Sequence, residues 1–86
     1  MAAKKDVRIV VLQGGRVAVG EYSKKGDACK LTHASIIRRW GTTRGLGELR
    51  NGPLKDTVLD PAGEIEFHVL GEIMTIRCEA SKWRLE

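Results

Sequence analysis

The stretch EIEFHVLGEIMTIRCE, residues 64–79, decides the fold class because it carries the clearest strand pattern in the chain. Its first half alternates apolar and polar residues, with Ile65 and Phe67 in one phase, as a strand with one buried face does. After Gly71 the apolar phase moves to Met74 and Ile76. A shift of one residue at a glycine is typical of a β-bulge or of a tight turn between two strands. The stretch therefore predicts β structure on both sides of Gly71.

The N-terminal residues continue this pattern. VRIVVLQ, residues 7–13, is short and β-branched and predicts a largely buried strand. Gly14-Gly15 predicts a two-residue hairpin turn, because glycine accepts positive φ at both central positions. RVAVGEY, residues 16–22, predicts the second strand, in which Gly20 indicates a bulge or a close backbone approach. KKGD, residues 24–27, is the next turn signal.

The middle of the chain begins with ACKLTHASIIRRW, residues 28–40. We expect either one long strand here or two pieces with a kink near Ala34-Ser35, where the apolar phase changes. Glycines punctuate residues 41–56, and the one helical turn expected there, around Leu46–Arg50, ends at Asn51-Gly52-Pro53.

KDTVLDPAG, residues 55–63, predicts a short strand followed by a turn at Asp60–Gly63. Proline presets φ in such a turn, and glycine accepts positive φ.

These signals predict a single, mainly β domain over residues 1–86. The expected architecture is a small barrel-like or strongly bent antiparallel sheet of about five or six short strands, with at most one short helical turn. Residues 1–6 are expected to be flexible, and residues 85–86 match a purification-tag remnant. Alternation assigns eight apolar residues to one core: Ile9, Val11, Val17, Val19, Leu31, Ile65, Phe67 and Ile76.

Charge is distributed unevenly along the 86 residues, whose formal net charge is +4. Residues 1–50 hold 11 Lys/Arg and 4 Asp/Glu, whereas residues 51–86 hold 4 and 7. This asymmetry favours a basic face for polyanions or head-to-tail contact between subunits, unless the fold interleaves the two halves. No apolar run is long enough for a spanning helix, and no signal-peptide cleavage pattern follows the first apolar run, so we expect a cytoplasmic protein.

Two cysteines, Cys29 and Cys78, occupy apolar phases of predicted strands. We expect both to be buried free thiols, with a disulfide between adjacent strands as the alternative.

IIRRWGTTRGLGEL, residues 36–49, is the most distinctive stretch and has three interpretations. A phosphate-binding loop is disfavoured, because the lysine–hydroxyl pair and a following long helix are both absent from the sequence pattern. A nucleic-acid contact would use arginines on phosphates and an indole on a base. A structural corner would place Trp40 over the core and use the glycines for positive φ. The residues of the nucleic-acid interpretation are Arg38, Arg39, Trp40, Arg44, Lys24 and Lys25, with Lys30 and Arg50 as extensions.

Metal binding and catalysis find little support in the sequence. Cys29, His33, His68 and Cys78 are zinc-type ligands, but positions four apart on a strand lie about 13 Å from each other, too far for one ion. No nucleophile stands beside a base in the pattern, so we expect no enzyme, no metal and no cofactor.

The segments ASIIRRWGTTRGLGEL, NGP, TVLDP and EFH resemble the signature of a family of short uncharacterised proteins encoded by bacteriophages and prophage-bearing bacteria. The resemblance covers roughly residues 16–83, and Arg-Arg-Trp-Gly-Thr-Thr is its most specific part. It implies a phage or prophage setting in a bacterial host cell, in which small accessory proteins are common. It implies no activity and no site residue, since that family, a domain of unknown function, has no established activity.

We therefore expect a non-enzymatic binding module that recognises a protein partner or a second copy of itself, since the edge strands of a small sheet are templates for pairing. The alternative is a nucleic-acid-binding module that uses the basic segment 36–50.

Overall fold

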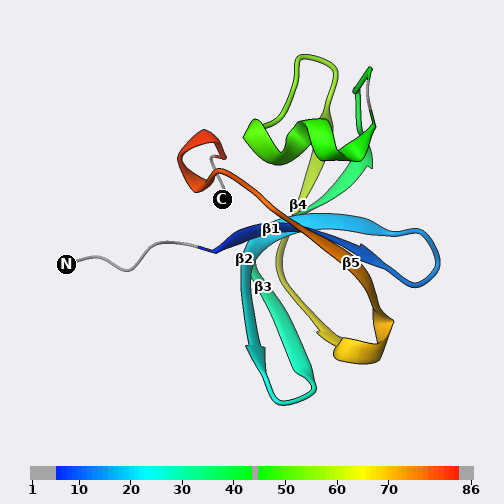
Figure 1. Cartoon of the computed structure of the whole chain (residues 1–86), viewed down its shortest axis with the longest axis vertical. Helices are drawn as coiled ribbons and strands as arrows, with labels where there is room; N and C mark the ends of the chain where they lie inside the picture. The colour runs from blue at the N-terminus through cyan, green and yellow to red at the C-terminus, as the bar shows by residue number, and fades with distance from the viewer. Residues whose placement is uncertain (1–5, 44, 84–86) are drawn as a thin grey trace.

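The computed structural model describes residues 6–43 and 45–83, and these form one open, strongly bent sheet of five antiparallel strands (Figure 1). The strand order is β4-β3-β2-β1-β5, so β4 and β5 are the two edges. The strands are β1 Val7–Leu12, β2 Val17–Lys25, β3 Ala28–Arg39, β4 Val58–His68 and β5 Glu72–Arg77. Three 3₁₀ turns accompany them: η1 Leu46–Asn51, η2 Val69–Gly71 and η3 Ala80–Lys82.

The mainly β prediction is confirmed, and so are its local signals at the first hairpin and at the expected helical turn. Gly14 and Gly15 have the expected positive φ, 89° and 82°, and lie between β1 and β2. The loop is longer than the predicted two-residue turn, because the Leu12 N–H donates to the Arg16 carbonyl at 2.8 Å and the Gly15 N–H donates to the Leu12 carbonyl at 3.1 Å. η1 coincides with the expected turn and ends at Gly52, whose φ is 109°. In the described ranges, no helix is long and apolar enough to cross a membrane.

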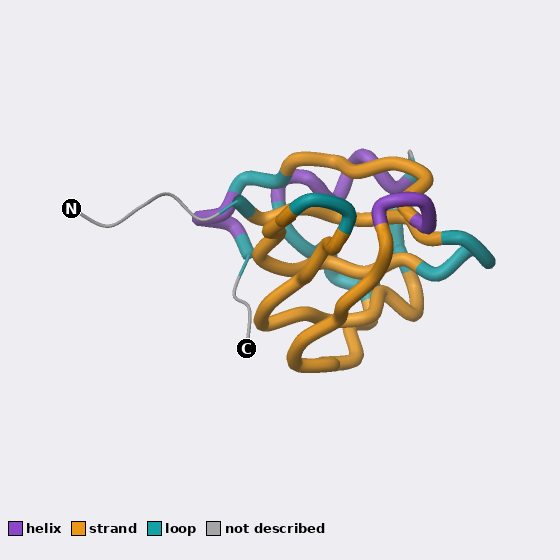
Figure 2. Tube along the Cα trace, turned by 90° about the horizontal axis from the view of Figure 1, so that it is seen from below, coloured by secondary structure: helices purple, strands orange, loops and turns teal. Residues whose placement is uncertain are grey.

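Irregular positions in three neighbouring strands bend the sheet. The β2–β3 register shifts at Gly20, where an added Cβ would lie 3.0 Å from the Cβ of Leu31, so both the predicted bulge and the close approach are confirmed. β3 is one strand, and His33 takes a φ of 52°, next to the predicted kink. In β4, Gly63 has a φ of 75° and lies opposite Ala34. Figure 2 shows the strand trace curling back below the helical turns.

The turn predicted at Asp60–Gly63 is wrong. β4 runs without interruption from Val58 to His68, and Pro61 lies inside it opposite Ser35 of β3. A proline is compatible with this strand because β4 is an edge strand, and on its outer side no neighbouring strand accepts a backbone N–H. The positive φ of Gly63 serves a bulge in the β3–β4 ladder instead of a turn.

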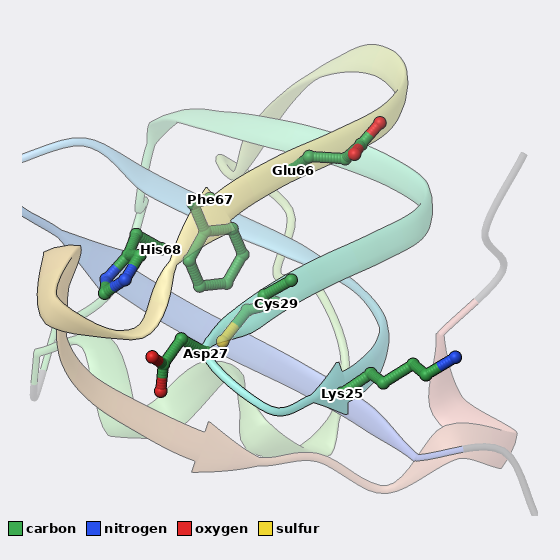
Figure 3. A pocket seen from close by; sticks show the side chains of 7 residues that line it. Lys25, Asp27, Cys29, Glu66, Phe67 and His68 are labelled. Carbon is green, nitrogen blue, oxygen red and sulfur yellow. The ribbon is translucent and has the colours of Figure 1, made fainter.

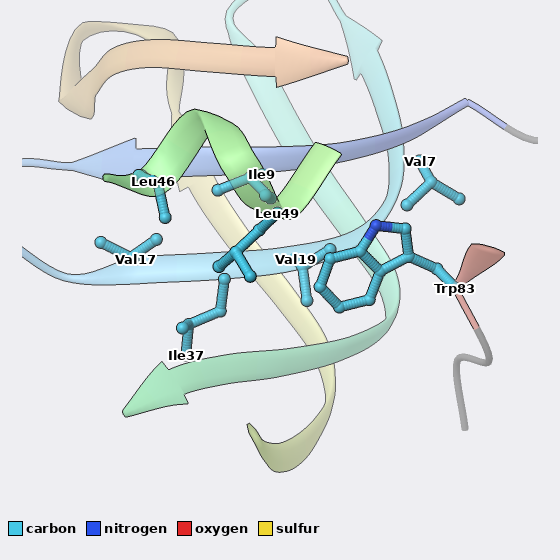
Figure 4. Packing of buried hydrophobic residues seen from close by; sticks show 8 residues of the cluster. All are labelled: Val7, Ile9, Val17, Val19, Ile37, Leu46, Leu49 and Trp83. Atoms are coloured by element: carbon cyan, nitrogen blue, oxygen red, sulfur yellow. The ribbon is translucent and has the colours of Figure 1, made fainter. Parts of the chain in front are cut away.

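The single predicted core is also wrong, because the buried residues form two clusters. Ile9 and Val10 are consecutive in β1, and both are 0% exposed, so β1 is buried on both faces of the sheet. The first core lies under η1 and the C-terminal turn (Figure 4) and contains Val7, Ile9, Val17, Val19, Ile37, Leu46, Leu49 and Trp83. The second core contains Val10, Ala18, Leu31 and Ala34.

The predicted core residues divide between the two clusters. Val11 and Ile76 pack partly buried against the first core, whereas Ile65 and Phe67 do so against the second. The division follows from the bend, which folds the outer halves of the long strands back over the sheet and covers its second face.

Candidate functional site

The structure places the predicted basic residues in two separate groups. Lys24 and Lys25 end β2 beside the hairpin turn at the bottom of Figure 1, whereas Arg38 and Arg39 end β3 at the opposite end of the same hairpin. Lys24 lies opposite Cys29 in the β2–β3 ladder. Cys29 precedes Arg39 by ten residues of β3, a contour length of roughly 33 Å at the rise of an extended strand. The bend lies between the two groups. The Nε of Arg38 is 3.1 Å from the carboxylate of Asp60 in an exposed ion pair.

Trp40 lies in the corner that follows β3 and is 41% exposed, so the expectation that it covers the core is wrong. Its carbonyl accepts a 2.7 Å hydrogen bond from the Thr57 hydroxyl, and that hydroxyl accepts the Leu54 N–H at 2.9 Å. Gly41 has a φ of 65°, and an added Cβ there would clash with the backbone of Asp56, so the predicted glycine corner is confirmed. Arg44, the third arginine of the stretch, lies outside the described residues.

Trp83 takes the core position that was expected for Trp40. It is 5% exposed and packs between Val7 and Val19 of the first core (Figure 4). Its indole N–H has no oxygen or nitrogen acceptor among the described residues. The N–H instead lies near the sulfur of Cys78, where it lowers the pKa of that thiol by less than burial raises it. The net pKa of Cys78 is raised to about 11, so this thiol is protonated at neutral pH.

A hollow of about 570 Å³ opens between the β2–β3 turn and the end of β4 (Figure 3). Cys29 and Phe67 lie opposite each other in the β3–β4 ladder and form its apolar floor. His68 also lines the hollow, and its Nδ1 accepts the Leu70 N–H at 3.0 Å.

The four zinc-type residues do not come together at one place. His33 Nδ1 is 2.8 Å from a carboxylate oxygen of Glu21, and Cys78 packs against the first core, away from Cys29. Among residues 6–43 and 45–83, no group of three or more His, Cys, Asp or Glu side chains has the geometry of a metal site.

A polar network ties the start of β5 to the bent half of β2. The Tyr22 hydroxyl donates to the Glu72 carboxylate at 2.7 Å and lies 3.6 Å from the Cys29 sulfur. Burial and the Glu72 bond raise the Tyr22 pKa above its ordinary value. The Arg8 guanidinium lies 4.4 Å from the centre of the Tyr22 ring and pairs with Asp6 at 2.9 Å. The network fixes the position of β5 against the sheet.

β4 is an edge strand whose sequence hinders pairing with another strand. Pro61 has no N–H to donate, and Gly63 holds a bulge within the strand. Glu64 and Glu66 are exposed and charged. Prolines, bulges and charges are the features by which sheet edges avoid association.

β5 is the other edge and has few of these features. Its residues, EIMTIR, include neither proline nor glycine, and its one bulge, at Ile73, lies near its beginning. Ile73 is 62% exposed and Met74 49%, and Leu70 in the preceding turn is 81% exposed. Three large apolar side chains are therefore exposed at an open sheet edge or in the turn that leads into it, a combination that marks interaction surfaces. Sequence alternation gave no signal for this exposure, because it assigned Met74 to a buried phase.

The hydrogen bonds between β1 and β5 determine which backbone groups of β5 face outward. The Cys78 N–H donates to the Val7 carbonyl at 2.8 Å, and the same register continues through Ile76. In an antiparallel ladder, hydrogen-bonded pairs alternate with pairs that are not bonded. Thr75 and Arg77 therefore make no bonds to β1, and their N–H and C=O groups point away from the sheet.

Comparison with known proteins adds no family: no family model matches the chain, and no curated protein or solved structure is significantly similar to it.

Proposed function

We propose that this chain is a non-enzymatic binding module that recognises protein by strand addition to β5. The observation that carries the proposal is the exposure of Leu70, Ile73 and Met74 at the edge of the sheet. The outward N–H and C=O groups of Thr75 and Arg77 supply main-chain hydrogen bonds, and the apolar side chains supply anchors for alternate residues of the added strand. The resemblance to bacteriophage and prophage proteins supports an accessory role in the bacterial cytoplasm.

Nucleic-acid binding is the second candidate, and the exposed indole of Trp40 beside Arg38 and Arg39 favours it. Two observations weigh against it. Arg38 is already paired with Asp60, and the bend separates this pair from Lys24 and Lys25. A split patch neutralises fewer phosphates of one nucleic acid than a continuous patch does.

Selection of extended peptides tests strand addition. A random peptide library is selected on the wild type and then measured against an Ile73→Lys/Met74→Lys variant. We expect the selected peptides to be rich in β-branched and aromatic residues, to shift the amide signals of residues 72–77, and to lose binding to the variant. The matched control is Glu64→Lys/Glu66→Lys, which changes charge at the other edge and should bind as the wild type does. Peptides that bind the β5 variant unchanged would contradict the proposal.

A salt titration with duplex and single-stranded oligonucleotides tests the alternative. For the protein-binding proposal, little binding survives physiological salt. Tight, salt-sensitive binding that is lost when Arg38, Arg39 and Arg44 are replaced together by alanine would favour the nucleic-acid function instead.

A further inference from the structure

We infer that the strand added to β5 is β5 of a second copy of this chain, related by a twofold axis that passes beside Thr75. The inference rests on the proposed function and names its partner. The two five-stranded sheets then form one continuous sheet across a closed dimer.

The difference between the two edges restricts how copies associate. If β4 of one copy paired with β5 of the next, the contact would be head-to-tail and would continue into a filament. Pro61, the bulge at Gly63 and the exposed glutamates block that contact at β4. The edge left open is β5, and a strand that pairs with itself in an antiparallel sense gives a symmetric interface that closes at two subunits.

The backbone phase of β5 limits the register of such a pair. Two residues that form a hydrogen-bonded pair across an antiparallel contact both point their N–H and C=O groups toward the other strand. Thr75 and Arg77 can therefore lie opposite only those residues of the second copy whose N–H and C=O groups also point away from β1. The register that centres the regular part of β5 after the Ile73 bulge, residues 74–76, on itself places Thr75 opposite Thr75 of the second copy. It also places Ile73 opposite Arg77 of the second copy.

The side chains are compatible with this register. Met74, half exposed in the single chain, lies opposite Ile76 of the second copy, and the reciprocal pair forms on the other side of the axis. Apolar side chains therefore cover each other on one face of the joined sheet. The two charged residues of β5, Glu72 and Arg77, face Cys78 and Ile73 of the second copy, so no like charges stand opposite each other.

A charge pair at position 75 tests both the dimer and its axis, since only a residue on the axis faces its own copy. Thr75→Lys and Thr75→Glu each place like charges opposite each other, whereas a mixture of the two variants places opposite charges there. Thr75→Val keeps the N–H and the side-chain shape and serves as the control. Molar mass is measured by sedimentation over a wide range of protein concentration, and thermal unfolding verifies that each variant folds.

We expect the wild type and Thr75→Val to reach twice the 9.5 kDa mass of one chain as concentration rises. Each charged variant alone should stay at the single-chain mass at the concentration where the wild type is dimeric, and an equal mixture should recover the doubled mass. Charged variants that dimerise alone, or a mixture that stays at the single-chain mass, would overturn the twofold axis at Thr75.

A wild type that keeps the single-chain mass throughout overturns the dimer. If selected peptides still shift the amide signals of residues 72–77 in that case, the proposed strand addition stands with a different partner. If the peptides also fail, both proposals are wrong.

Discussion

Replacing Gly20 with alanine tests the close strand approach on which the bend of the sheet depends. The added methyl carbon would lie 3.0 Å from Leu31 Cβ, 3.1 Å from the Thr32 carbonyl oxygen and 3.2 Å from Ala34 Cα, whereas ordinary contacts lie at 3.4–4 Å. These neighbours are backbone atoms or a Cβ of β3, and none of them can rotate out of the way as the end of a long side chain can. Leu31 and Ala34, which flank the contact, are both 0% exposed. Strands β2 and β3 must therefore separate to accommodate the methyl group.

Overpacking of this kind costs about 1–3 kcal/mol, and the lower entropy of alanine in the unfolded chain offsets about 0.4–1 kcal/mol of it. We expect the melting temperature to fall by about 4–8 °C for each kcal/mol of net destabilisation in a domain of this size. Thermal and urea unfolding, followed by far-ultraviolet circular dichroism, measures the change. Gly47→Ala in η1 is the matched control, because an added Cβ there meets nothing within 4 Å. If both variants are equally stable, β2 and β3 are not in close contact at Gly20.

Three further predictions concern stability. Trp83→Ala should lower the free energy of unfolding by about 3–5 kcal/mol, because Trp83 is 5% exposed, whereas Trp40→Ala, at a position 41% exposed, should lower it by under about 1 kcal/mol. Urea unfolding measures both values, and equal losses would contradict the two placements. Phe67→Ala should lose less than the 3–5 kcal/mol or so that a fully buried phenylalanine costs, since Phe67 packs only partly buried against the second core, and an unchanged melting temperature would place Phe67 on the surface. The free energy of unfolding should fall as pH rises from 9.0 to about 11, because the Cys78 thiol of the unfolded chain ionises at a lower pH than the buried thiol of the folded chain. Replacing Cys78 with alanine should make this fall shallower. Native Cys78 should also react slowly with a thiol reagent at neutral pH, and fast reaction would show an accessible thiol.

Local chemistry made most strands and turns predictable. Gly14-Gly15 specifies its hairpin through backbone freedom alone, and the end of η1 at Gly52 follows from the same property. Gly20 indicates a bulge or a close backbone approach, because a glycine within an alternating strand has few other uses. Each of these signals acts over a few residues and needs no knowledge of distant contacts.

Features that depend on distant contacts were predicted wrongly. Pro61 and Gly63 form a turn signature, yet they lie in a strand because β3 pairs along the whole of β4. Trp40 and Trp83 have the same side chain, and their burial differs because η1 and the C-terminal turn cover one place on the sheet and not the other. The division of the core likewise arises from the bend, which no single strand encodes.

Local sequence signals and contacts between distant residues together determine which sheet edge is the candidate for interaction. β4 and β5 are separated in sequence only by the short turn η2, yet they lie at opposite ends of the strand order. Because β3 covers one side of β4 and β1 covers one side of β5, each keeps one open side, and only the residues on that side decide whether it associates. β4 presents a proline, a bulge and carboxylates there, whereas β5 presents apolar side chains and unpaired backbone groups. The sequence shows that edge strands exist, but only the strand order shows which one is left open.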